Sequence, residues 1–189
     1  MIDQVALAMN VATMAHQGQH EWGGSRIPYV GHPFRVAAIL DAWECATTYM
    51  TAAAYLHDVL THTSCSASDI EMFGVDGHVI ELLFQLEKMQ LEALARAQGP
   101  DENVPFPSDY QDVHLTDEAK LIMLIDRMDD VRSLNKYRLA LHELHVSDDY
   151  IRKFKGVTRL MIPMFKEIRY EVKGDILDSL ERDLDFKEA

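Results

Sequence analysis

Apolar residues recur every three to four positions along most of the chain, which is the spacing that places them on one face of an α-helix. Capping and helix-breaking residues divide this pattern into segments, beginning with Asp3 and Gly18 at the two ends of the first. Pro33 suits a first helical position, which makes His32 the expected N-cap of its helix. The pattern predicts helices over residues 3–17, 33–43, 51–60, 66–74, 77–97 and 116–137, a long amphipathic helix from 147 with a kink at Pro163, and a shorter one after Gly174.

No stretch alternates apolar and polar residues as a half-buried strand does, and neither an internal repeat nor a linker is visible. The chain is therefore predicted to be a single all-α domain over residues 1–189. The segment 98–116 contains three prolines and is expected to form a long loop. The C-terminal helix suits packing either on its own core or on a second subunit, so an oligomer is possible.

Composition narrows the classes of partner. With 18 basic and 31 acidic residues, the formal net charge of −13 disfavours nucleic acid and anionic membranes as partners. No apolar run approaches the about 20 residues that cross a bilayer, and no signal peptide is visible. Cys45 and Cys65 are expected to be reduced thiols of a cytoplasmic protein, although a disulfide between them is the alternative. A phosphate-ester substrate would need local positive charge from a metal or from a few basic side chains.

Four residues from three predicted helices could supply such a metal site: His32, His57, Asp58 and Asp126. Each lies in or beside an apolar segment, where an ionisable side chain is costly unless something compensates it. Two imidazoles and two carboxylates suit a divalent transition metal such as Mn²⁺ or Fe²⁺ and leave positions for water. The alternative is that the histidines are core residues whose rings bond to backbone carbonyls.

Five motifs occur in the order and approximate spacing of one known family: "AHQGQ" (15–19), "PYVGHPFRVAAIL" (28–40), "AAAYLHDV" (52–59), "MFG" (72–74) and "AKLIMLIDRMDDVRSL" (119–134). Over residues 3–140 the sequence resembles the HD-domain phosphohydrolases of the RelA/SpoT type, above all the small stand-alone (p)ppGpp hydrolases such as the metazoan SpoT homologue. The resemblance implies a helical HD domain, completed by the helices of 147–189. It also implies that His32, His57, Asp58 and Asp126 bind one Mn²⁺, which activates water to hydrolyse a nucleotide polyphosphate.

The sequence departs from this family at its chemical centre. The family pattern is His-Asp, two residues, then Glu-Asp, whereas the last two positions here are Thr61 and His62. His62 is the expected replacement, because an imidazole with a pKa near 6.5 can act as a general base or acid. The alternative is that His62 is a solvated residue at a helix end.

Substrate recognition departs from the family as well. An Arg-Lys pair that grips the nucleotide is replaced by Glu21, which would repel a phosphate, and Trp22, which could stack on a base or instead plug the edge of the core. Arg26 could contact a phosphate or remain solvated. Asp130 stands where the family has Asn, and it could bind a second cation or a substrate hydroxyl, or pair with a neighbouring arginine such as Arg127.

The resemblance and the departures from it leave two functions open. The first is a metal-dependent phosphohydrolase acting on (p)ppGpp or a related nucleotide. The second is a catalytically degenerate HD domain that binds a nucleotide or a protein partner without hydrolysis.

Overall fold

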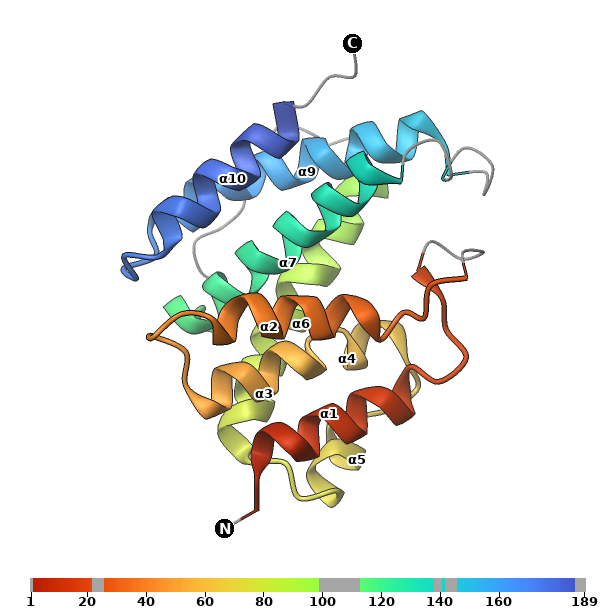
Figure 1. Ribbon diagram of the computed structural model, residues 1–189, viewed down its shortest axis with the longest axis vertical. Coiled ribbons are helices and arrows are strands. Elements are labelled where there is room, and N and C mark those ends of the chain that lie inside the picture. The colour runs from red at the N-terminus through yellow and green to blue at the C-terminus, as the bar shows by residue number, and fades with distance from the viewer. Residues whose placement is uncertain (1, 22–25, 99–112, 138–140, 142–145, 186–189) are drawn as a thin grey trace. The chain divides into compact units, whose positions relative to one another are not determined.

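The computed structural model describes residues 2–21, 26–98, 113–137, 141 and 146–185 (Figure 1). Within these ranges the chain is helical and contains no β-strand, apart from an isolated bridge between His20 and Pro28. This confirms the predicted all-α class. The helices are α1 (Gln4–Ala15), α2 (Gly31–Asp41), α3 (Thr48–Leu56), α4 (Val59–His62), α5 (Ala67–Met72), α6 (Gly77–Gln98), α7 (Asp117–Lys136), α9 (Asp148–Lys166) and α10 (Lys173–Asp185).

The chain forms two compact units, Met1–Gln90 and Leu91–Ala189. The first unit contains α1 to α5 and most of α6, and the second contains the last turns of α6 together with α7, α9 and α10. The single domain expected from the sequence stays a prediction, and each unit is described by itself.

Helix α3 is the centre of the first unit, because it packs against both α1 and α2. Its middle is the run Ala52, Ala53 and Ala54, all with no exposed surface. Small side chains let neighbouring helices approach closely, and the Thr47 hydroxyl caps the helix by accepting a hydrogen bond from the Met50 amide at 3.2 Å. The apolar run before the His-Asp pair is therefore a buried helix, as the sequence predicts, but the predicted bounds 51–60 are wrong, because α3 is Thr48–Leu56 and a separate helix α4 begins at Val59.

Most helix ends lie where the sequence places them. Asp3 caps α1 because its side chain accepts hydrogen bonds from the amides of Val5 and Ala6, and Gly18 follows this helix with a φ of 79°. A reciprocal capping box between Ser66 and Asp69 begins α5, and Gly74 follows it with a φ of 92°. Glycine is the residue that adopts this left-handed backbone without strain.

The start of α2 is an exception, since the prediction that His32 is its N-cap is wrong. Val30 is the N-cap and makes no side-chain capping bond, and the helix begins at Gly31. Pro33 is thus the third helical residue, which is tolerated because the first amides of a helix have no partner within it. His32 lies inside the first turn, where its ring is buried.

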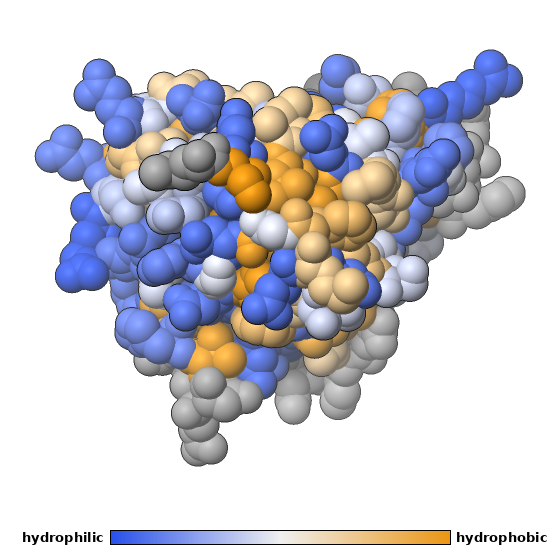
Figure 2. Space-filling view, turned by 90° about the horizontal axis from the view of Figure 1, so that it is seen from below, coloured by the Kyte–Doolittle hydropathy of each residue, from blue (hydrophilic) through white to orange (hydrophobic). Residues whose placement is uncertain are grey.

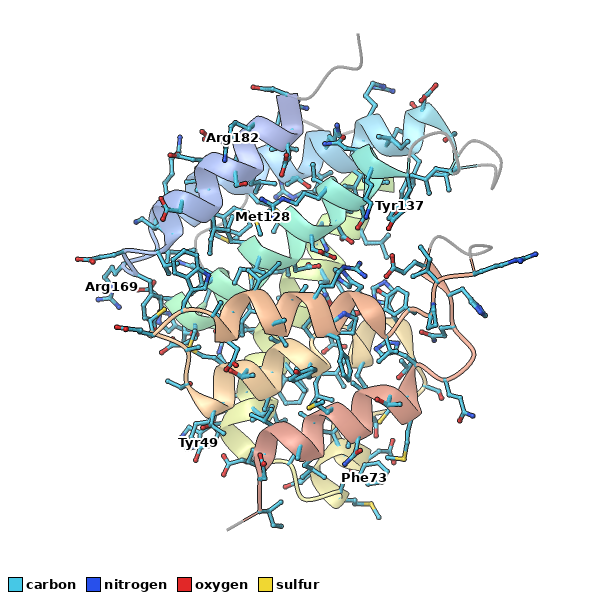
Figure 3. The ribbon with its side chains drawn as sticks, in the orientation of Figure 1. Tyr49, Phe73, Met128, Tyr137, Arg169 and Arg182 are labelled. Atoms are coloured by element: carbon cyan, nitrogen blue, oxygen red, sulfur yellow. The ribbon has the colours of Figure 1, made fainter. Side chains whose placement is uncertain are left out.

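In the second unit α7 packs against α9 and α10, and α9 packs against α10. The core face of α7 carries apolar residues at helical spacing, all of them buried: Leu121, Leu124, Ile125, Met128 and Val131. Thr116 caps α7 and Ser147 caps α9, which continues past Pro163 to Lys166. Arg169 extends from the turn that connects α9 and α10 (Figure 3) and binds Asp117 at 2.7 Å.

The surface carries apolar as well as charged areas, as the face in Figure 2 illustrates. In the first unit the exposed large apolar residues include Tyr49 and Phe73, which reach outward in Figure 3. None of the described helices combines the length and the apolar character needed to cross a membrane.

Candidate metal and catalytic site

The backbone places the His-Asp pair at a break between two helices. Helix α3 ends at Leu56, His57 and Asp58 follow as its C-cap and the N-cap of α4, and α4 runs only to His62. The His62 amide donates to the Asp58 carbonyl at 2.9 Å, so Asp58 and His62 are one helical turn apart. Residues four positions apart on a helix share a face, and His62 Nδ1 lies 3.5 Å from Asp58 Oδ1.

Three potential ligand atoms converge at this break, from His32, His57 and Asp58. The two Nε2 atoms lie 3.3 Å apart, and Asp58 Oδ2 lies 3.2 Å from His57 Nε2 and 3.5 Å from His32 Nε2. All three residues are at least 96% buried. The ring of His57 is oriented by its Nδ1, which donates to the Ala54 carbonyl at 2.8 Å. In the neutral ring the lone pair is therefore on Nε2, and in the protonated ring Nε2 also carries a hydrogen and faces Asp58.

This arrangement suits a divalent cation. When His57 is neutral, the lone pair on its Nε2 faces an imidazole nitrogen and a carboxylate oxygen, and a metal ion among these buried atoms would stabilise them, as protonation of an imidazole also does. Ligands about 2.0–2.2 Å from an ion and at right angles lie about 3 Å apart, so the observed separations need only a small contraction. The donor set of two imidazoles and one carboxylate is typical of a transition metal.

Asp58 is held by donors on both of its oxygens. The Tyr29 hydroxyl donates to Oδ2 and the Gln90 amide donates to Oδ1, each at 2.7 Å. Burial raises the pKa of Asp58, but the charge and hydrogen bond of His57, the hydrogen bond of His62 and the charge of His32 outweigh it. The net effect holds the pKa of Asp58 well below its usual range, so the group is a carboxylate at neutral pH.

His62 is the exposed member of the cluster, with half of its side chain accessible. Its Nδ1 lies 2.8 Å from the Thr61 hydroxyl, and its ring stacks on Tyr29 with centroids 5.7 Å apart. The Gln19 amide donates to its backbone carbonyl at 2.7 Å. His62 is therefore an ordered side chain beside the cluster.

His16 is buried beside this site. Its Nδ1 lies 2.8 Å from the Gln19 amide oxygen, and its ring packs on Tyr29 at 4.9 Å. Burial lowers the pKa of His16, which favours the neutral ring. Its Nε2 has no hydrogen-bond partner among the described residues.

The nucleotide-binding residues predicted from the sequence are only partly described. Trp22 lies outside the described residues, and Arg26 is exposed on its loop. Glu21 is buried, and its carboxylate is paired with Arg35 of α2 at 2.8 Å. The predicted repulsion between Glu21 and a phosphate is thus offset by a neighbouring cation that sequence spacing did not identify.

The predicted ligand Asp126 belongs to the second unit, on α7. It is completely buried, and Arg127 donates to its Oδ2 from Nε at 3.0 Å and from Nη2 at 2.7 Å. Arg127 also pairs with Asp130 at 3.3 Å and lies over the Phe154 ring. The ion pairing that the sequence offered as an alternative for Asp130 is therefore present.

Sequence reasoning missed two residues of the site. Neither Gln90 nor Tyr29 was identified as a site residue, although both bond to Asp58. A glutamine 32 positions away on another helix leaves no local signal in the sequence. The proline-tyrosine pair of the "PYVGHP" motif is the one signal that could have pointed to Tyr29.

Comparison with known proteins gives a consistent set of relatives. The bifunctional (p)ppGpp synthase/hydrolase SpoT of Escherichia coli K12 is 33% identical over 140 residues, which are 72% of this chain and 19% of that protein. The guanosine-3′,5′-bis(diphosphate) 3′-pyrophosphohydrolase MESH1 of Xenopus tropicalis is 30% identical over 135 residues, 68% of each chain. The MESH1 of Drosophila melanogaster is 33% identical over 130 residues, 67% of this chain and 66% of that protein. No family model matches.

A solved structure, described as a metazoan orthologue of SpoT that hydrolyses ppGpp, has the same fold. It superposes with a TM-score of 0.69 at 20% identity and covers 96% of both chains. The chain thus spans about a fifth of the Escherichia coli SpoT protein that it matches, but about two thirds of the MESH1 proteins.

Proposed function

This chain belongs to the family of guanosine-3′,5′-bis(diphosphate) 3′-pyrophosphohydrolases, and from that membership we propose that it is a metal-dependent phosphohydrolase. The proposed reaction removes a phosphate or pyrophosphate group from a nucleotide that is (p)ppGpp or resembles it. One observation carries the proposal: His32 Nε2, His57 Nε2 and Asp58 Oδ2 lie within 3.5 Å of one another in a buried place.

The proposed metal ligands are His32, His57, Asp58 and Asp126. The first three are supported by their convergence, and Asp126 is proposed on the sequence resemblance alone. Mn²⁺ is the proposed ion, with Fe²⁺ as the alternative, because both accept imidazole and carboxylate together. When bound, such an ion lowers the pKa of a coordinated water and polarises a phosphoryl oxygen.

His62 is the proposed general base and acid. Its half-exposed ring is accessible to an attacking water, whose proton it would accept as the water oxygen forms the new P–O bond. The P–O bond to the leaving oxygen then breaks, and the imidazolium returns the proton to that oxygen. No other reactant is needed. Tyr29 and Gln90 keep Asp58 oriented throughout, because each donates to one of its oxygens.

Substrate contacts are proposed for Trp22, Arg26 and Asp130. Trp22 would stack on the base, Arg26 would bind a phosphate, and Asp130 would accept a bond from a substrate hydroxyl. Because the net charge of −13 repels a phosphate group, the substrate phosphates need a local positive group such as Arg26 or the metal ion. The absence of nucleic acid and membrane partners is proposed on the same net charge, and a cytoplasmic location on the two cysteines, which are expected to be reduced.

A second function is favoured by one specific observation, the replacement of the family Glu-Asp pair by Thr61 and His62. A degenerate HD domain would keep the metal cluster and bind a nucleotide or a protein without turnover.

A release assay separates the two functions. We would measure phosphate and pyrophosphate released from (p)ppGpp, NADPH and the common ribo- and deoxyribonucleotides with Mn²⁺ present. Asp58→Ala should abolish release because it removes a ligand, whereas Asp149→Ala, which removes an exposed carboxylate of α9, should leave it unchanged. Silence of the wild type across the panel, with Mn²⁺ bound, would support the binding function instead.

A further inference from the structure

A chain of hydrogen bonds connects Asp58 to His62 through two intermediate side chains. Gln90 Nε2 lies 2.7 Å from Asp58 Oδ1, and Gln90 Oε1 lies 2.8 Å from the Thr61 hydroxyl. That hydroxyl lies 2.8 Å from His62 Nδ1. We call Asp58, Gln90, Thr61 and His62 the amide relay.

The direction of each bond in the relay follows from donor and acceptor chemistry. A carboxylate oxygen can only accept, so the Gln90 amide must present its NH₂ group to Asp58 and its oxygen to Thr61. The Thr61 hydroxyl has one hydrogen, and its nearest partners other than His62 are both acceptors: Gln90 Oε1 at 2.8 Å and the Asp58 carbonyl at 3.3 Å. If the hydrogen pointed to His62, the hydroxyl oxygen and Gln90 Oε1 would face each other at 2.8 Å with no hydrogen between them, which is repulsive. The hydrogen therefore points to Gln90, and Thr61 accepts from His62.

His62 Nδ1 must then be the nitrogen that carries the hydrogen. Two oxygens surround it, the Thr61 hydroxyl at 2.8 Å and Asp58 Oδ1 at 3.5 Å, and both act as acceptors. In a neutral imidazole one nitrogen donates and the other carries the lone pair. The lone pair of the neutral His62 ring is thus on Nε2.

We propose that Gln90, acting through Thr61, is a positioning residue that fixes His62 in its Nδ1–H tautomer and so makes Nε2 the basic nitrogen. The tautomer itself is independent of any activity, and its catalytic consequence rests on the function proposed above. Within the relay, Gln90 Oε1 is the acceptor that orients the Thr61 hydroxyl.

The tautomer can be measured directly by NMR. Long-range ¹H–¹⁵N correlation spectra of the full chain, without added metal or nucleotide, distinguish a protonated from an unprotonated ring nitrogen. The spectra would be recorded about two pH units above the ordinary imidazole pKa of about 6.5, with His62 assigned by its absence in His62→Gln. We expect Nδ1 of His62 to be protonated and Nε2 unprotonated. A protonated Nε2, or an even mixture of tautomers, would overturn the proposal.

Matched variants test the role of the relay. Thr61→Val removes the hydroxyl at nearly constant size, and Thr61→Ser retains it. Thr61→Val and Gln90→Met should raise the Nε2–H fraction of His62, while Thr61→Ser should keep the wild-type tautomer. If Gln90→Met leaves the tautomer unchanged, Gln90 is not the positioning residue.

Activity supplies a second readout. In the Mn²⁺-loaded enzyme Thr61→Val should lower kcat by about 10- to 100-fold, a part of what a general base contributes, with KM little changed. A loss confined to KM would contradict a role for the relay in the chemical step. The predicted tautomer without turnover of any nucleotide would leave the relay intact and refute the proposed function.

Discussion

Replacing Tyr29 with Phe tests whether the orientation of Asp58 sets metal affinity. The change removes one hydroxyl, which donates to Asp58 Oδ2 at 2.7 Å, and keeps the ring between His16 and His62. The hydrogen bond to the carboxylate is part-buried, and a hydrogen bond to a charged group contributes about 1.5–3 kcal/mol. The cost should fall mainly on the metal-bound state. Without metal, the imidazoles of His32 and His57 also lie beside Oδ2 and can compensate for the lost hydroxyl. With metal bound, both imidazoles would be ligands of the ion and could no longer do so.

The expected loss is therefore about 10- to 100-fold in Mn²⁺ affinity, because about 1.4 kcal/mol corresponds to tenfold and residues that orient metal ligands typically contribute 10- to 100-fold. Isothermal titration calorimetry of the metal-free protein with Mn²⁺ measures it. Tyr55→Phe is the matched control, since this ring of α3 packs on Phe34 at 4.8 Å and should leave the affinity unchanged. Affinity of Tyr29→Phe within about twofold of the wild type would refute the reasoning.

Three further predictions concern stability, each measured by thermal unfolding. Burial raises the pKa of Asp117, but the hydrogen bonds of Arg169 lower it by more, so the net effect is a lowered pKa. The ion pair therefore stabilises the fold fully above the ordinary carboxyl pKa of about 3.9, and this stabilisation is lost as the pH falls through the lowered folded-state pKa. Asp117→Asn should lower Tm by about 1–3 °C at neutral pH and not in acid, and an equal loss at both would contradict this. Arg35→Leu should lower Tm by about 3–6 °C, because it leaves the buried Glu21 carboxylate without this cation. Adding Glu21→Gln should restore most of the lost Tm, and the absence of any restoration would contradict a role for the ion pair. Gly31→Ala should raise the free energy of unfolding by about 0.4–1 kcal/mol, because alanine reduces the conformational freedom of the unfolded chain. The added Cβ would lie at van der Waals distance, 3.4 Å from Arg35 and 3.5 Å from Glu21. A lower Tm would mean that these two side chains cannot adjust to it.

The helices were predictable because their signals are local. Asp3, Ser66 and Thr116 each cap a helix through bonds to amides two or three positions away, and such bonds follow from sequence spacing. The failure at His32 has a local cause too. Proline is allowed in any of the first helical positions, so Pro33 alone could not distinguish a helix that begins at Gly31 from one that begins two residues later.

The site was predictable only as far as its residue types allowed. His32, His57 and Asp58 were identified because ionisable residues beside apolar helical runs are unusual and because their motifs resemble a known family. The donors that hold Asp58 could not be predicted, since Tyr29 and Gln90 are about 30 positions away in opposite directions. Contacts of that kind depend on how helices pack, and no periodicity in the sequence encodes them.

The most direct test of the metal site is an anomalous diffraction experiment on crystals grown with Mn²⁺. We predict one strong anomalous peak about 2.0–2.3 Å from His32 Nε2, His57 Nε2 and Asp58 Oδ2, and none in crystals of Asp58→Ala. A wild-type map with no peak among these three atoms, in crystals that bind Mn²⁺ elsewhere, would contradict the proposed metal centre.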